Sequence, residues 1–228
     1  MTDLASHSTD YSVVEEEPPT IVARNLLVGA HIWSSATGFF FIAFLFAYFY
    51  LRSLNESHQW KPKGISAPTG WGTAIMVCVV LSAVLVWWGA IDQRSDRRPL
   101  WRMKGLAALI LGLAAFVLQI VAWTQLDWGP THGGFASVYL GWTGLYALFV
   151  FGSLYWLETI LAVSYRYRNE PMDRPAVEPG HASGDPDRLG HDIANPVTLN
   201  TAELRAFTSY MSVLAGIGVV TWIVLYLI

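Results

Sequence analysis

WGTAIMVCVVLSAVLVWWGAI, the stretch from Trp71 to Ile91, contains no charged residue. An α-helix needs about 20 consecutive apolar residues to cross the hydrocarbon core of a bilayer. The stretch has that length, and its apolar residues do not alternate with polar ones as they would in a strand of a β-barrel. Because a backbone in lipid must satisfy its own hydrogen bonds, the sequence predicts a membrane-spanning helix here.

Four other stretches have the same character, so we predict an all-α integral membrane protein with five membrane-spanning helices. The predicted spans are residues 26–51, 71–91, 105–124, 135–165 and 206–228. The fourth is longer than the hydrocarbon core is thick, which indicates a tilted helix or a protruding turn.

The composition of the 228 residues agrees with a membrane protein. Hydrophobic residues make up 54% of the chain and charged residues 14%, whereas about a quarter of the residues of a soluble domain are charged. The net charge is -3 and no basic stripe is present, which argues against binding of nucleic acid. The single cysteine, Cys78, cannot form an intrachain disulfide or a thiolate metal cluster.

Two segments are too polar to lie in a membrane. Residues 1–25 are acidic and contain Pro18 and Pro19, so they predict a disordered tail rather than a basic signal peptide. Residues 166–205 are rich in proline, arginine and acidic residues and predict a solvated polar loop. Asn200 or Thr201, followed by Glu203, has the spacing of a helix cap within that loop.

The distribution of basic residues predicts the orientation. Eleven lysines and arginines flank the spans on the side of the N-terminus, against three on the other side. The positive-inside rule therefore predicts a cytoplasmic N-terminus, a cytoplasmic 166–205 loop and an external C-terminus. Trp60, Trp71 and Trp128 are expected at the outer membrane interface and Trp101 near the inner one, since tryptophan favours these interfaces.

Few ionisable side chains lie within the spans. A membrane haem usually needs a pair of axial ligands, but His31 is the only histidine well inside a span. We therefore predict no catalytic residue and no metal site in this chain, and expect His31 to be a neutral imidazole hydrogen-bonded to a neighbouring helix. Glu158 is the only acidic residue within a span. A structural role beside Arg166 and Arg168 is favoured over a proton relay.

Three stretches resemble subunit III of the haem–copper (cytochrome c) oxidases, in the short five-helix form found in bacteria. They are FFFIAFLFAYFYLR from Phe39, LGLAAFVLQIVAW from Leu111, and FASVYLGWTGLYALFVFGSLYW from Phe135. Among the positions that match the family pattern are Arg52, Gly112, Gln119, Trp123, Ser137, Thr143, Gly144 and Gly152.

The resemblance implies a non-catalytic subunit in a bacterial inner (plasma) membrane. In that family haem and copper reside in subunits I and II, and cytochrome c or quinol delivers electrons only to those subunits. Subunit III packs against subunit I, holds phospholipids in a cleft between two helix groups, and protects the complex during oxygen reduction and proton pumping. By analogy we expect the matching positions to serve packing, lipid contact or subunit contact. We expect the first two spans to form one group and the last three the other.

The sequence also departs from the family pattern. The family usually buries a glutamate at the position of Thr37, an acid at Ala122, and histidines at Tyr146 and Phe149. Neutral residues at all four positions put a role in proton uptake in doubt. An accessory subunit of a quinol oxidase or nitric oxide reductase remains an alternative, as does a free-standing assembly factor or permease. A permease should have broken helices and polar groups near the midplane, which are scarce here.

Overall fold

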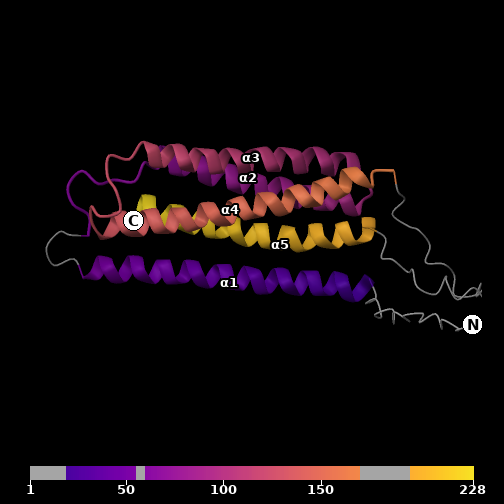
Figure 1. Cartoon of the computed structure of the whole chain (residues 1–228), viewed down its shortest axis with the longest axis horizontal. Coiled ribbons are helices and arrows are strands. Elements are labelled where there is room, and N and C mark those ends of the chain that lie inside the picture. Colours follow the sequence, from indigo (N-terminus) through magenta and orange to yellow (C-terminus); the bar gives the residue numbers. More distant parts are fainter. Residues whose placement is uncertain (1–18, 55–59, 170–195) are drawn as a thin grey trace, which may run out of the picture.

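The computed structural model describes residues 19–54, 60–169 and 196–228, and this part of the chain is helical without any strand (Figure 1). All five long helices are apolar enough to cross a membrane, which confirms the all-α, multi-pass prediction. They are α1 (Pro19–Ser53), α2 (Thr69–Arg94), α3 (Arg98–Thr124), α4 (Gly134–Arg166) and α5 (Pro196–Trp222), and a π-helix (Ile223–Leu227) follows α5 directly.

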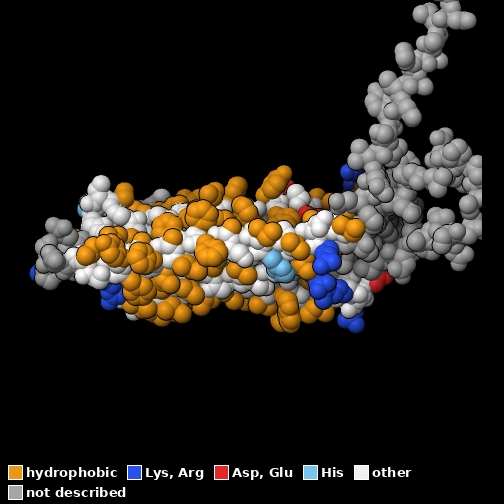
Figure 2. Space-filling model, turned by 90° about the horizontal axis from the view of Figure 1, so that it is seen from below, with side chains coloured by type: hydrophobic (Ala, Val, Ile, Leu, Met, Phe, Trp, Pro, Cys, Tyr) orange, Lys and Arg blue, Asp and Glu red, His pale blue; other side chains and the backbone are white. Residues whose placement is uncertain are grey.

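The helices lie side by side along one long axis, and the start of α1 and the C-terminus lie at opposite ends of the bundle (Figure 1). Most basic side chains in the described ranges gather at the end where α1, α3 and α5 begin, and we call it the arginine-rich end. Figure 2 shows the apolar band between the two ends, with blue side chains at its borders. Among the described basic residues, only Arg52, Lys61 and Lys63 lie at the other end of the bundle.

The helices α2 and α3 form a close antiparallel pair, because only residues 95–97 connect them. The buried residues of each helix recur every three or four positions, which gives two continuous seams. The seam of α3 consists largely of small side chains, which let the two backbones approach each other. Its members are Trp101, Gly105, Ala108, Gly112, Ala115, Gln119 and Ala122. Across the pair, Ser82 Oγ donates a hydrogen bond to the Ala108 carbonyl at 2.8 Å.

Trp101 does not face the headgroup region as the sequence suggested; it is fully buried between helices. Two glycines provide the space that its indole ring fills. A Cβ atom on Gly89 of α2 would lie 2.5 Å from Trp101 Cε3, and one on Gly105 would lie 3.0 Å from the same indole. The expectation of an interfacial indole was wrong because the glycines of two helices make room for it inside the bundle.

The predicted grouping of the first two helices is also wrong. The first helix packs on α5 and α4, whereas α2 packs mainly on α3 and α5. The long connection 54–68 lets α1 and α2 separate, whereas the three-residue turn after α2 enforces the α2–α3 pair. On α4, Phe149 lies against Phe41 of α1, with 5.8 Å between the ring centroids, and Tyr146 lies 5.9 Å from the same ring.

Several helices continue beyond the apolar stretches that predicted them. The first begins at Pro19, inside the predicted tail, and α5 begins at Pro196, inside the predicted loop. Asn200 is therefore not a cap: it is buried within α5, and its Nδ2 donates to the Ile160 carbonyl at 2.9 Å. Hydropathy marks only the part of a helix that matches the hydrocarbon, so polar outer turns escape it. The rest of the predicted tail and loop, 1–18 and 170–195, lies outside the described residues.

Candidate functional site

A groove runs along α1 near the arginine-rich end and faces α4. Its volume is about 560 Å³. Its α1 wall consists of Val22, Asn25, Leu26, Gly29, Ala30 and Trp33, and its α4 wall is Trp156. The α1 residues recur every three or four positions, so they share one face of the helix.

The groove has space because Gly29 of α1 carries no side chain to fill it, and because contacts with α5 hold the Trp156 side chain of α4 in place. No atom lies within 4 Å of a Cβ atom placed on Gly29, so a larger side chain there would occupy the groove. The indole of Trp156 donates through Nε1 to Glu203 Oε1 of α5 at 2.9 Å, and its ring centroid lies 5.3 Å from that of Phe207. This role of Glu203 could not be predicted from the sequence, because Trp156 and Glu203 are distant in the chain.

The groove has the chemistry of a binding site for an apolar molecule. Its volume lies in the range of small-molecule pockets, which is roughly 300–1,000 Å³. Apart from Asn25, its lining is apolar or aromatic. Indole rings suit the boundary between acyl chains and headgroups. The groove can therefore hold an acyl chain.

One side of α4 has no packing partner within the described chain, and we call it the open face of α4. It comprises Gly144, Leu148, Gly152, Tyr155 and Glu158; Phe151 at its edge contacts Phe116 of α3, with 5.0 Å between the ring centroids. No atom lies within 4 Å of a Cβ atom placed on Gly144 or Gly152. Tyr155 is 69% exposed and Leu148 63% exposed. This face is apolar and has shallow positions where another helix could approach.

Glu158 lies on the open face of α4, in the half of the helix toward the arginine-rich end. The expected contact with a nearby arginine is absent: among the described residues the carboxylate makes no ion pair. An ionisable group on the membrane surface of a helix normally has a partner. Among the described residues, this carboxylate is thus left without a charged partner.

The matching positions of α3 and α4 meet in the bundle. Trp123 Nε1 donates to Thr143 Oγ1 at 3.1 Å, and that hydroxyl donates to the Tyr139 carbonyl at 2.7 Å. Gly112 receives the side chain of Leu154 from α4. These contacts hold α3 and α4 together.

Gln119, Arg52 and Ser137 have different surroundings. Gln119 is buried, but its Nε2 has no hydrogen-bond partner in the described chain. Arg52 Nη1 donates to the Ile228 carbonyl at 3.2 Å and lies 3.4 Å from Tyr48 Oη. Ser137 Oγ donates to the Pro130 carbonyl at 2.5 Å. The last two fix the end of the bundle opposite the arginine-rich end.

His31 is exposed on the outside of α1. Its ring makes no hydrogen bond to a described residue, so the expected bond to a neighbouring helix is absent. The reason is its register: the residues of α1 that line the groove lie on the opposite side of the helix from His31. The described ranges contain no group of three or more histidine, cysteine or acidic residues placed to hold a metal ion.

Neutral packing occupies the positions where the family pattern would bury ionisable groups. Thr37 Oγ1 donates to the Trp33 carbonyl at 2.9 Å, within its own helix. Tyr146 Oη donates to the Leu214 carbonyl of α5 at 3.2 Å. Ala122 is buried in the seam of α3, and Phe149 packs on α1. Each of these side chains contributes to helix packing.

No protein-family model and no curated protein matches the chain. Its function is therefore inferred from the groove, the open face of α4 and the packing of the matching residues.

Proposed function

We propose that the chain is subunit III of a haem–copper terminal oxidase, a non-catalytic subunit of cytochrome c oxidase that packs against the catalytic subunit I. The observation that carries the proposal is the open face of α4. Gly144 and Gly152 match the subunit III pattern, yet nothing in the described chain packs on them. Small residues on membrane helices are typical of helix–helix interfaces.

The other glycines show what such positions do when a partner is present. Gly72 receives the ring of Tyr226, Gly89 that of Trp101, and Gly218 that of Tyr146. Gly144 and Gly152 lack such a neighbour, as do Gly29, Gly38, Gly70 and Gly216 on the other described helices; what distinguishes the two is that they share one face of α4 and match the subunit III pattern. In the proposal, side chains of subunit I occupy them and a hydrogen-bond donor or cation of that subunit meets Glu158.

We also propose which membrane contains the chain and which subunits carry out the redox chemistry. The chain lies in a bacterial plasma membrane with the arginine-rich end in the cytoplasm, as the positive-inside rule predicts. Haem and copper belong to the partner subunits I and II, where cytochrome c or quinol delivers electrons. The chain contributes packing surface and lipid, and no step of oxygen reduction takes place on its residues.

We assign the groove beside α1 to an acyl chain of a phospholipid that stabilises the complex. Gly29→Leu is expected to fill the groove and to lower the number of tightly held phospholipids, because the new side chain takes the space of the acyl chain. The readout is phospholipid phosphorus per protein after extensive washing in detergent. Gly38→Leu is the matched control, since a Cβ atom there also meets nothing. Equal lipid content in the two variants would contradict the assignment.

Removal of the chain is expected to shorten the working life of the oxidase while leaving its initial rate nearly unchanged, because the catalytic groups lie in other subunits. Oxygen consumption followed over many turnovers, with and without the chain, checks this. An initial rate that falls to background would indicate a direct catalytic role. An unchanged decay of activity would remove the protective function from the proposal.

A further inference from the structure

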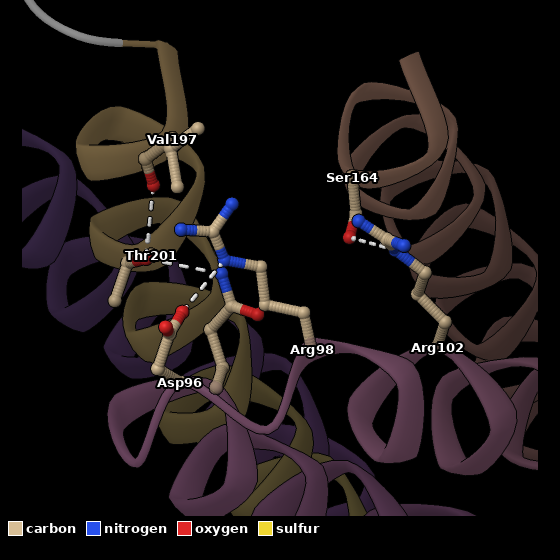
Figure 3. Close-up of polar contacts among 7 residues, drawn as sticks. Asp96, Arg98, Arg102, Ser164, Val197 and Thr201 are labelled. Carbon is tan, nitrogen blue, oxygen red and sulfur yellow. Dashed lines mark hydrogen bonds and ion pairs between the residues drawn. The ribbon is translucent and has the colours of Figure 1, made fainter. Parts of the chain in front are cut away.

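A polar cluster lies at the arginine-rich end, where α3 begins between α4 and α5 (Figure 3). Arg98 and Arg102 stand one turn apart on α3, and Figure 3 shows their guanidinium groups on either side of the gap between α5 and α4. A small pocket of about 10 Å³ lies among them. Its lining includes Gln93, Arg98, Arg102, Ser164, Tyr167 and Asn200.

Arg102 is held in place without an ion pair to any described residue. Its Nε donates to Ser164 Oγ at 3.1 Å, and its guanidinium carbon lies 5.5 Å from the centroid of the Tyr165 ring. It makes no ion pair with a described residue, and its two terminal nitrogens make no hydrogen bond in that part of the chain. A planar guanidinium presented in this way fits two oxygens of a phosphate.

The neighbouring groups keep the pocket in shape. Gln93 Nε2 of α2 donates to Thr201 Oγ1 of α5 at 3.2 Å, and that hydroxyl donates to the Val197 carbonyl at 2.9 Å (Figure 3). The end of α2 is thereby bound to the start of α5, beside the first turns of α3. An oriented guanidinium loses little freedom when it binds an anion.

Among the described residues around the cluster, positive charge exceeds negative charge. Asp96 pairs with Arg98 at 2.9 Å, and its own side chain is 68% exposed; Asp92 pairs with Lys104. These are the acidic residues that the described ends of α2, α3 and α4 present here. The basic residues of the same ends are Arg94, Arg97, Arg98, Arg102, Lys104, Arg166 and Arg168. The surplus favours an anionic ligand.

An apolar surface continues from the cluster toward the middle of the membrane. Leu106 and Ile110 follow Arg102 at intervals of four residues, so they share its side of α3. They are 46% and 59% exposed. A molecule whose phosphate meets Arg102 would therefore have its hydrocarbon part beside exposed aliphatic side chains, which is the arrangement of a phospholipid and not of a free phosphate ion.

We propose that Arg102 binds the phosphate of an anionic phospholipid, whose acyl chain lies along Leu106 and Ile110. Ser164 and Tyr165 orient the guanidinium for this contact. The site shares no lining residue with the groove beside α1, and it does not depend on the assignment to an oxidase. The ligand belongs to the membrane leaflet at the arginine-rich end.

Native mass spectrometry of the full-length protein, purified in detergent with whatever subunits accompany it, tests the site. Phosphatidylglycerol, phosphatidylcholine and inorganic phosphate are added in separate titrations. We expect the anionic lipid to bind about tenfold more tightly than the zwitterionic one, and Arg102→Gln to remove that preference. Arg94→Gln is the control, because it deletes the same charge from an exposed position at the same end.

A second variant separates an oriented site from general surface charge and covers the case in which Arg102→Gln does not fold. Ser164→Ala keeps every charge but removes the hydroxyl that holds Arg102 Nε, so we expect it to weaken binding of phosphatidylglycerol severalfold. Wild-type affinity in Ser164→Ala would overturn the proposal. Equal losses in Arg94→Gln and Arg102→Gln would also overturn it, as would displacement of the lipid by millimolar inorganic phosphate.

Discussion

Gly89→Ala is expected to destabilise the folded chain by about 1–3 kcal/mol, the usual cost of adding a carbon to a filled core. The added Cβ atom would lie 2.5 Å from Trp101 Cε3, and the fully buried indole has no free space beside it to move into. The midpoint of thermal unfolding in detergent, followed by circular dichroism, should fall accordingly.

Two other glycines give this prediction its controls. Gly112→Ala meets the terminal methyl of Leu154, which can rotate, so its loss should be smaller. Gly152→Ala meets nothing, and should be neutral or stabilising by up to about 1 kcal/mol because alanine favours a helix. Equal losses at the three positions would show that close packing around Trp101 does not limit the stability of the bundle.

Gly152→Trp is expected to leave the chain itself folded but to lower the haem that copurifies with it at least tenfold. The open face of α4 offers room for an indole when the chain is alone, whereas in the proposed complex a helix of subunit I occupies that room. The measurement is haem absorbance per tagged chain after purification in mild detergent, beside the unfolding midpoint of the same sample.

The matched control for this substitution is Gly38→Trp on α1, because Gly38 is likewise free of neighbouring atoms. It should retain the haem of the wild-type preparation. If Gly38→Trp loses the haem and Gly152→Trp keeps it, the docking face lies on α1 and the assignment of the open face of α4 is wrong.

The five helices could be predicted because a span needs only length and hydropathy, and both are local properties of the sequence. The Trp71–Ile91 stretch is an example: α2 extends it only to Thr69 and Arg94. Helix ends in polar flanks, such as the start of α5 at Pro196, could not be predicted from hydropathy. A helix continues there as long as its backbone hydrogen bonds are made.

Packing could be predicted far less well, because it depends on contacts between residues distant in sequence. Trp101 lies inside the bundle because of Gly89 and Gly105, and no local pattern links the three. The pairing of α1 with α5 was missed for the same reason. Trp123 and Thr143 were recognised as family positions, but only the structure shows their hydrogen bond.

For the candidate sites, too, single residues could be predicted from the sequence, whereas contacts between distant residues could not. The sequence singled out Gly144, Gly152 and Glu158 but could not show that they share one unpacked face of α4. It did not predict the groove beside α1, because the groove combines Gly29 and Trp33 with Trp156 from another helix. The arrangement around Arg102 was likewise hidden, since Ser164 reaches it from the far end of α4.

The most direct test of the assignment to an oxidase is a reduced-minus-oxidised visible spectrum of the tagged chain purified from its native membrane in mild detergent. We expect haem bands in stoichiometric amount, together with larger subunits on a gel, and the haem type and oxidisable substrate would identify the branch. A colourless, monodisperse protein near its own mass would overturn the assignment to an oxidase and favour a free-standing permease or assembly factor.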